Sequence, residues 1–320
     1  MSVRDTRYPL LTACYVLLVT CFGCSSKPYY KETRLMMGTI VEITAQDKSA
    51  INAAFDQIKK IEKIANNFDP GSEISQLNRD GKIRASVDLL AMVKESLKFY
   101  SFSNGAFDIT VNPVVEIWKE KIKKSQDEKS NAILPAEERI RDRLRLIGSD
   151  KIIINDKESL ITFDQQGMSI DLGAIAKGYA VDKAVVRLKD LGIHSAMVNA
   201  GGNIYCLGKK GKRMWRIGIQ HPRKPEAIFF TLDLENQAAS TSGDYQQYFI
   251  ARGKRYSHII DPKTGYPVDN KVISVTIIAK DAATADALST TVFVLGKEKA
   301  QALLQKIGGV QVKVIEEKDL

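Results

Sequence analysis

The chain has 320 residues, of which 44% are hydrophobic and 27% charged, a balance typical of one large folded domain or two closely joined ones. Lys and Arg outnumber Asp and Glu by 47 to 38, which gives a formal net charge of +9. The basic residues are not interleaved with aromatic ones, so no nucleic-acid partner is expected, whereas anionic ligands or an anionic membrane surface fit this charge.

The first 24 residues predict a signal peptide. Two arginines precede the apolar run Leu10–Phe22, which is too short for a comfortable bilayer span and is followed by Gly23 and Cys24. The position of Cys24 resembles the lipidated cysteine of a bacterial lipoprotein, and the alternative is a simple secretory signal cut just after it. In both cases the mature chain lies outside the cytoplasm.

We therefore divide the chain into a signal at 1–24, a polar tether at 25–32 and a folded domain at 33–320. If Cys24 is lipidated, the protein is lipid-anchored at the cell membrane, on the periplasmic face where the cell has two membranes. Ser25 follows Cys24 in place of an inner-membrane retention Asp, which favours the outer membrane in such a cell.

Strand and helix patterns alternate through the domain. Period-2 alternation predicts a strand at Gly38–Thr44, and helical spacing of apolar residues predicts amphipathic helices at Ser49–Asn66 and Asp88–Ser103. The highly charged stretch Lys119–Asp150 is interpreted as solvated helices with little chemistry. Later apolar runs, separated by Gly-containing turns, predict mainly antiparallel strands, and strands with packing helices indicate an α+β fold of two intimately joined subdomains.

A β-branched strand at Ser274–Ala279 leads through a short turn into a helix that ends at Gly296. Asp286 and Thr290 are four residues apart and therefore share one face of this helix, near its positive N-terminal end. A carboxylate and a hydroxyl placed there are hard oxygen ligands of the kind that Mg²⁺ or Ca²⁺ takes. The alternative is a capping Asp and a Thr that faces water.

Two further stretches carry polar side chains beside glycine or a turn. Asp171 precedes a glycine-containing helix entry, and Lys177 falls in the first turns of that helix, where phosphate partners are common. His258 stands at a strand–turn boundary. A lone His is more often structural, but its ordinary pKa suits proton transfer near neutral pH.

The order of these motifs resembles the ApbE family from about Met36 to Gly296. The similar segments, in chain order, are Met37–Thr39, Ser72–Ser75, Phe107–Thr110, Asp171–Gly178, Asn199–Asn203, Ser240–Tyr245, Ser257–Pro262 and Ala285–Thr290. Members of that family are FAD:protein FMN transferases, and some act as FAD pyrophosphatases. The resemblance implies an ApbE-like fold.

The resemblance also implies a ligand set. The Mg²⁺ ligands would be the side chains of Asp286 and Thr290 and the backbone carbonyls of Ala174 and Ser289. Phe68 stands where the family often has Tyr, so ring stacking should survive without the hydroxyl. Residues matching positions that line the FAD site are Met37, Phe68, Ala106, Phe107, Asp108, Asp171, Lys177 and His258.

The implied reaction moves FMN from FAD onto a Thr or Ser hydroxyl of an acceptor protein and releases AMP. His258 and Asp171 are the two candidates for the base, and Lys177 is either a phosphate or a flavin or adenine contact. The acceptor would be an extracytoplasmic part of a membrane redox complex with a Ser-Gly-Ala-Thr-x-Thr-like motif. The alternatives are an FAD pyrophosphatase, a non-catalytic flavin-binding lipoprotein and, less well matched, a solute-binding lipoprotein.

Overall fold

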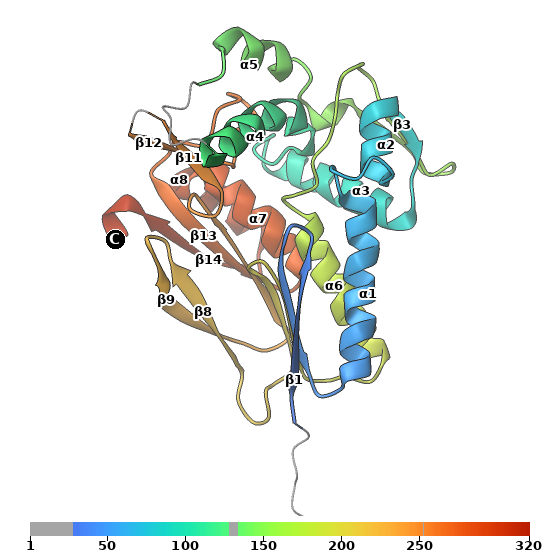
Figure 1. Cartoon of the computed structure of the whole chain (residues 1–320), viewed down its shortest axis with the longest axis vertical. Helices are drawn as coiled ribbons and strands as arrows, with labels where there is room; N and C mark the ends of the chain where they lie inside the picture. The colour runs from blue at the N-terminus through green and yellow to red at the C-terminus, as the bar shows by residue number, and fades with distance from the viewer. Residues whose placement is uncertain (1–27, 128–133, 252) are drawn as a thin grey trace, which may run out of the picture.

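A computed structural model describes residues 28–127, 134–251 and 253–320 (Figure 1). The predicted signal peptide and the Cys24 lipidation site lie outside the described residues. A seven-stranded sheet forms the centre of the molecule, and all of its pairings are antiparallel. Its strands, in spatial order, are β1 (Tyr30–Met36), β2 (Thr39–Ala45), β6 (Ala196–Ala200), β7 (Asn203–Leu207), β10 (Gln237–Gly243), β13 (Val272–Ala279) and β14 (Gln311–Glu316).

Helices α1 (Lys48–Ala65), α6 (Ala176–Asp190) and α7 (Ala282–Leu295) pack against this sheet, and α6 contacts both α1 and α7 (Figure 1). Each presents apolar residues at helical spacing, such as Ile51, Phe55 and Ile58 of α1, which are fully buried. The hairpin of β8 (Trp215–His221) and β9 (Lys224–Leu234) has a separate hydrophobic cluster, in which Trp215 packs with residues of β7, β10 and β13.

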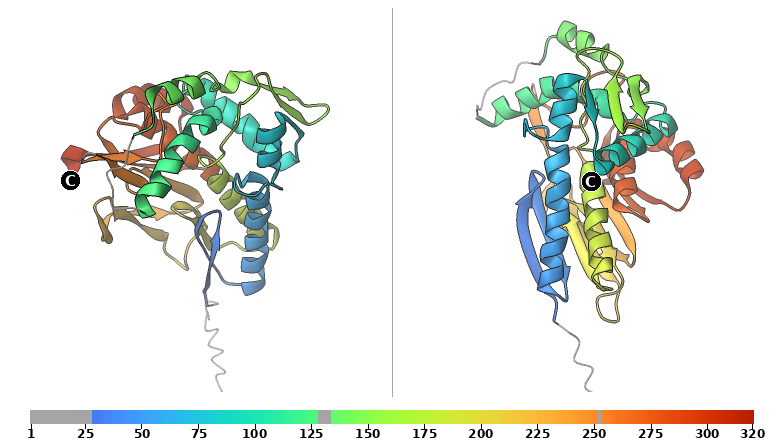
Figure 2. Two further views of the ribbon diagram at one scale, coloured as in Figure 1. Left: turned by 45° about the horizontal axis from the view of Figure 1, so that its top comes forward. Right: turned by 90° about the vertical axis from the view of Figure 1, so that its right-hand side faces the viewer.

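Most of the remaining elements gather toward the upper end of the molecule in Figure 1, whereas those that follow α7 in the chain lie near the middle of that view (see also Figure 2). The larger hydrophobic cluster continues from the central sheet into this part, so the two predicted subdomains share one core. These elements are α2 (Glu73–Asp80), β3 (Lys82–Arg84), α3 (Val87–Phe102), η1 (Ile109–Val111), α4 (Asn112–Asp127), α5 (Glu137–Leu144), η2 (Ser149–Lys151), β4 (Ile152–Asn155), β5 (Leu160–Phe163), β11 (Tyr248–Ala251), β12 (Lys254–Ser257), α8 (Lys297–Ile307) and η3 (Glu317–Asp319).

A buried carboxylate joins three helices. The Asp88 carboxylate, at the start of α3, forms ion pairs with Lys60 of α1 at 2.8 Å and with Lys183 of α6 at 3.0 Å. It also accepts a 3.0 Å hydrogen bond from the Tyr179 hydroxyl of α6. Burial alone would raise the pKa of Asp88, but these partners outweigh it and lower the pKa to about 2. The charged form of Asp88 therefore stabilises the packing of α1, α3 and α6.

The α+β architecture and the β13–α7 unit confirm the sequence predictions, and the β4–β5, β6–β7 and β11–β12 hairpins are among the antiparallel strands expected in the later part of the domain. The end of the predicted tether at 25–32 was wrong, because β1 already begins at Tyr30, which pairs with Ala45 of β2. The charged residues of β1 made this segment resemble a polar tether, although charged residues are common on edge strands. In the described part of the chain, no helix is both long and apolar enough to span a membrane.

Candidate active site

A cleft of about 1100 Å³ opens where the β1–β2 turn, the end of α1, the entry to α6 and the N-terminal half of α7 meet. The structure brings almost all of the predicted site residues together there. Ser289 is the exception, since it is fully buried within α7, behind the wall of the cleft. The predicted residues that line the cleft are Met37, Phe68, Ala106, Phe107, Asp108, Asp171, Ala174, Lys177, His258, Asp286 and Thr290.

Asp286 lies at the base of the cleft because of the local sequence of α7. Asp281 caps this helix by accepting a 2.8 Å hydrogen bond from the Thr284 amide, which places Asp286 just beyond the first turn. The Gly178 amide donates to Asp286 at 3.0 Å, and the Lys177 ammonium stands 3.9 Å away. Burial raises the pKa of Asp286 above its ordinary value, although Lys177 and the Gly178 amide oppose this.

Gly178 is what allows α6 to approach α7 so closely. A β-carbon at this position would lie 2.2 Å from the carbonyl oxygen of Ala282 and 2.8 Å from the α-carbon of Ala283. The start of α7 is also held from α6 by Asp182, whose carboxylate accepts hydrogen bonds from the Ala282 and Ala283 amides at 2.8 and 2.9 Å. The two helix entries therefore form one rigid corner beside Asp286.

Buried hydroxyls connect the sheet to the Asp286 face of α7. Ser289 donates to the Asp286 carbonyl at 2.9 Å and lies 2.8 Å from the Ser242 hydroxyl, which in turn lies 3.3 Å from Thr290. Ser240 donates to the Asn203 side chain at 2.6 Å, and Asn203 also hydrogen-bonds Asp286. Such a network fixes the orientation of the Asp286 and Thr290 side chains.

The chemistry of this donor set suits a hard divalent cation. No group of three His, Cys, Asp or Glu side chains that could hold a metal occurs in residues 28–127, 134–251 and 253–320. A metal site built from three or more such side chains is therefore absent from this part of the chain. One buried carboxylate and one hydroxyl facing a cleft are instead the kind of partial shell that Mg²⁺ accepts, because it retains waters and binds substrate phosphates.

Lys119 of α4 is a cleft residue that the sequence did not reveal. Its ammonium is 2.7 Å from the Asp171 carboxylate and 5.7 Å from the centre of the Phe68 ring. The stretch Lys119–Asp150 was interpreted as solvated helices, and Lys119 departs from that interpretation because it lines the cleft and pairs with Asp171. It belongs to a charged helical stretch, and only the packing of α4 over the cleft distinguishes it from a solvated lysine.

Asp171 is held as an ion. Its other oxygen accepts a 2.7 Å hydrogen bond from the Gly173 amide, and Lys177 donates to the Gly173 carbonyl at 2.6 Å. Burial raises the pKa of Asp171, but Lys119, the Gly173 amide and Lys177 more than offset this effect, so the net pKa lies below its ordinary value. Asp171 is consequently a poor proton acceptor near neutral pH.

His258 presents a neutral imidazole to the cleft. Burial, with the positive charges of Lys177 and Lys119, lowers its pKa to about 4. The Nδ1 atom lies 3.1 Å from the Gln247 carbonyl oxygen, which can only accept, so Nδ1 carries the proton. The lone pair then resides on Nε2, and that nitrogen is available as a base without prior deprotonation.

Aromatic and apolar residues form the rim of the cleft. The Phe68 side chain is 84% exposed, whereas Ala106 and Phe107 are buried. Met37 adopts a positive φ of 52° in the tight β1–β2 turn, where its amide donates to Glu62 at 2.5 Å. A positive φ is uncommon for a side chain of this size, so this turn is held by its surroundings.

Asp108 also lines the cleft, but it has a clear structural role. One of its oxygens accepts hydrogen bonds from the Thr110 amide at 2.8 Å, the Thr110 hydroxyl at 2.5 Å and the Ser149 hydroxyl at 2.6 Å. Burial raises the pKa of Asp108, and these hydrogen bonds oppose the shift. Asp108 thus fixes the loop that carries the neighbouring cleft residues.

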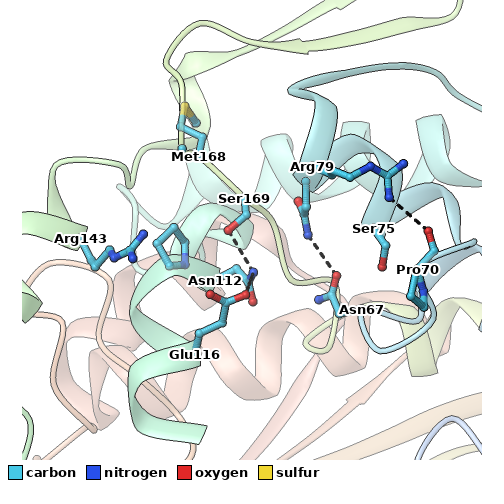
Figure 3. Close-up of a pocket in the computed structure, with 12 residues that line it drawn as sticks. Asn67, Pro70, Ser75, Arg79, Asn112, Glu116, Arg143, Met168 and Ser169 are labelled. Carbon is cyan, nitrogen blue, oxygen red and sulfur yellow. Dashed lines mark hydrogen bonds between the residues drawn. The ribbon is translucent and has the colours of Figure 1, made fainter. Parts of the chain in front are cut away.

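A second, smaller recess of about 430 Å³ adjoins the cleft, and Asn67 lines both (Figure 3). Side-chain amides that line this recess hold the segment that leads to Asp171 in place. Asn78 donates to the Ile170 carbonyl at 2.9 Å and accepts from the Ile170 amide at 2.7 Å, while Asn112 donates to the Ser169 hydroxyl at 3.0 Å. These contacts support Asp171, and no local pattern in the sequence indicates them.

Comparison with known proteins agrees with this geometry. The family model described as "ApbE family" matches residues 37–314, which is most of the chain. The chain belongs to the ApbE family. A relative from Haemophilus influenzae named "FAD:protein FMN transferase" is 31% identical over 300 residues, covering 86% of this chain and 85% of that protein. A Treponema pallidum relative with the same name is 31% identical and covers 91% of this chain and 85% of its own length.

Solved ApbE structures show the same fold. The ApbE protein of Thermotoga maritima superposes with a TM-score of 0.80 at 32% identity, covering 91% of this chain and 95% of that one. The flavin transferase ApbE from Vibrio cholerae has a TM-score of 0.80 at 29% identity, with 91% and 94% covered. The ApbE-like fold predicted from the order of motifs is therefore confirmed.

Proposed function

We propose that this protein is an FAD:protein FMN transferase, which moves FMN from FAD onto a hydroxyl of an acceptor protein and releases AMP. The observation that carries the proposal is the base of the cleft, where Asp286 and Thr290 face Lys177 beneath an exposed aromatic rim. The names of the ApbE relatives that match most of this chain support it. Phosphoryl transfer needs such charge neutralisation and positioning more than covalent chemistry.

Mg²⁺ would be held by the Asp286 carboxylate and the Thr290 hydroxyl, with the Ala174 and Ser289 carbonyls as the further proposed ligands. When bound, the ion would neutralise charge on the pyrophosphate of FAD. Lys177 supplies a second positive charge 3.9 Å from Asp286. Phe68 offers an uncovered ring face on which a ring of FAD can stack.

His258 is the better candidate for accepting the proton of the acceptor hydroxyl. Its Nε2 bears a free lone pair at neutral pH, because Nδ1 donates to Gln247 and the imidazole pKa lies near 4. Asp171 is engaged by Lys119 and the Gly173 amide, so in this proposal it positions the flavin nucleotide. The oxygen so activated would attack the FMN-side phosphorus, and AMP would leave.

The acceptor in this proposal is an extracytoplasmic part of a membrane redox complex with a Ser-Gly-Ala-Thr-x-Thr-like motif. The enzyme itself would be attached to the membrane through a lipid on Cys24, which the apolar run before Gly23–Cys24 supports. The +9 net charge is compatible with an anionic membrane surface and with an anionic substrate.

One incubation tests the proposal. The protein is mixed with FAD, Mg²⁺ and an acceptor fragment bearing the motif; intact-mass spectrometry follows the acceptor, and chromatography follows the nucleotides. We expect an acceptor heavier by one FMN moiety, with AMP released, and no reaction with Asp286→Ala. Free FMN and AMP with an unmodified acceptor would instead identify a pyrophosphatase. FAD that stays intact throughout would leave only a flavin-binding protein.

A further inference from the structure

The central sheet has two functionally different ends. At one end the strand termini align in a row, with Tyr30 opposite Ala45, Ala45 opposite Ala196 and Ala196 opposite Leu207. At the other end the same strands turn at Met37 and at Gly201–Gly202, both of which contribute to the cleft. The seven residues of β1 separate the two ends by about 20 Å at roughly 3.3 Å per residue.

The row of strand termini identifies the segments that lie at the Tyr30 end of the sheet (Figures 1 and 2). Helix α1 starts there after Ala45, α6 ends there before Ala196, and the loop between β7 and β8 emerges there after Leu207. We call Lys209–Arg213, in that last loop, the basic loop. Its side chains are exposed, and they are followed by Met214, which is 48% exposed.

The basic loop is fastened to the segment at which the described chain begins. The Tyr29 ring packs edge-on against Trp215 with centroids 5.6 Å apart, and its hydroxyl lies 2.6 Å from that of Ser195. The Gly211 amide donates to the Tyr29 hydroxyl at 3.3 Å, and the Lys210 ammonium lies 5.8 Å from the centre of the Tyr29 ring. Cys24 precedes Tyr29 by five residues, a reach of at most roughly 17 Å.

The charge at this end is available for an external partner. Lys209 is 3.5 Å from Glu235, but Lys210, Lys212 and Arg213 form no ion pair with any carboxylate in the described part of the chain. Lys48 at the start of α1 and Lys189 near the end of α6 add two more ammonium groups. Asp47 and Asp190 also lie here and offset the charges of Lys48 and Lys189, so the excess positive charge belongs to the basic loop.

We propose that the basic loop contacts the anionic phospholipid headgroups of the membrane that carries the protein. This inference rests on the lipid anchor at Cys24 put forward above. A polybasic patch on anionic headgroups is a common second contribution to membrane binding beside a lipid anchor. Here the patch lies beside the segment that would lead to the lipid, so both can engage one bilayer at once.

This contact also sets the height of the active site. With the Tyr30 end on the headgroups, the Met37 turn and the cleft stand about 20 Å above them, one β1 strand-length away. The acceptor hydroxyl must therefore lie in a segment that extends outward from the bilayer by a similar distance. An acceptor residue at the membrane surface itself would not reach the cleft.

The experiment uses the full lipidated protein in vesicles of phosphatidylcholine, with or without phosphatidylglycerol. An amine-reactive reagent labels surface lysines, and peptide mass spectrometry reports the rate at Lys210, with Lys157 in the β4–β5 turn as the internal control. We expect Lys210 to react several-fold more slowly on the anionic vesicles, and this protection to disappear at high salt. The rate at Lys157 should not change.

A charge-reversed variant, Lys212→Glu with Arg213→Glu, provides the matched comparison. It should lose the protection of Lys210 while retaining FMN transfer to a soluble acceptor, since neither residue contacts the cleft. Equal Lys210 rates on both kinds of vesicle would overturn the proposal. An intact mass without lipid would overturn it together with the anchor, whereas a failure of FMN transfer in the wild type would concern the proposed enzyme activity alone.

Discussion

Replacing Gly178 by alanine tests whether the close approach of α6 and α7 builds the Asp286 site. Helix propensity alone predicts stabilisation by up to about 1 kcal/mol, because glycine is unfavourable within helices. The structure predicts the opposite sign. The new β-carbon would lie 2.2 Å from the Ala282 carbonyl oxygen, and this backbone atom cannot rotate away.

Overpacking of this kind costs about 1–3 kcal/mol. Separating the helices also weakens the 3.0 Å hydrogen bond from the Gly178 amide to Asp286. We expect the free energy of unfolding of Gly178→Ala to fall by about 2 kcal/mol, which lowers the melting temperature by roughly 3–4 °C in a domain of this size. Mg²⁺ affinity should fall with it, because the carboxylate is displaced.

Calorimetric unfolding and Mg²⁺ titration measure the two effects. Val186→Ala is the matched control on the same helix, since Val186 is 52% exposed, and it should change the free energy of unfolding by less than about 0.5 kcal/mol. A Gly178→Ala protein as stable as the wild type, with unchanged Mg²⁺ affinity, would refute the reasoning. It would mean that α6 and α7 can separate without cost.

Three further outcomes are expected. The pKa of Asp88 is about 2 instead of 3.8, so its ion pairs contribute roughly 2 kcal/mol to the free energy of unfolding above pH 4, and this contribution is lost as the pH falls toward 2. The free energy of unfolding of Asp88→Asn, measured over the same pH range, should not show this decrease. Lys119→Gln should raise the pKa of His258, measured by NMR titration, and move the acid limb of FMN transfer to higher pH; an unchanged pKa would contradict the assigned cause. Ser242→Ala should weaken Mg²⁺ binding roughly tenfold by calorimetry, because Thr290 loses its partner, while Ser242→Thr should retain it.

The local parts of the site were predictable from the sequence. Asp286 and Thr290 fall on one helix face whenever their segment is helical, whereas the structure was needed to show that Asp281 caps that helix. The Gly-containing turns expected between the later strands include Gly201–Gly202, which joins β6 to β7. The residues expected to line an FAD site were predicted only through the resemblance to the ApbE family, and the structure shows that they gather around one cleft.

Other features depend on contacts between distant segments. Asp88 looked like a residue near a helix start, yet it joins α1, α3 and α6. Asn203 looked like a turn residue, yet it supports Asp286 from across the sheet. Propensity and periodicity describe neighbours along the chain, so they carry no information about which helix will lie over which loop.

The sequence by itself determined the alternation of strands and helices, the oxygen pair on α7 and the order of motifs, because each depends on spacing within one segment. Only the tertiary structure decided that Lys119 reaches Asp171, that Gly178 brings α6 against α7, and that the basic loop lies one strand-length from the cleft. These depend on the packing of segments far apart in the chain, where burial and steric fit select one arrangement among the many that local patterns allow.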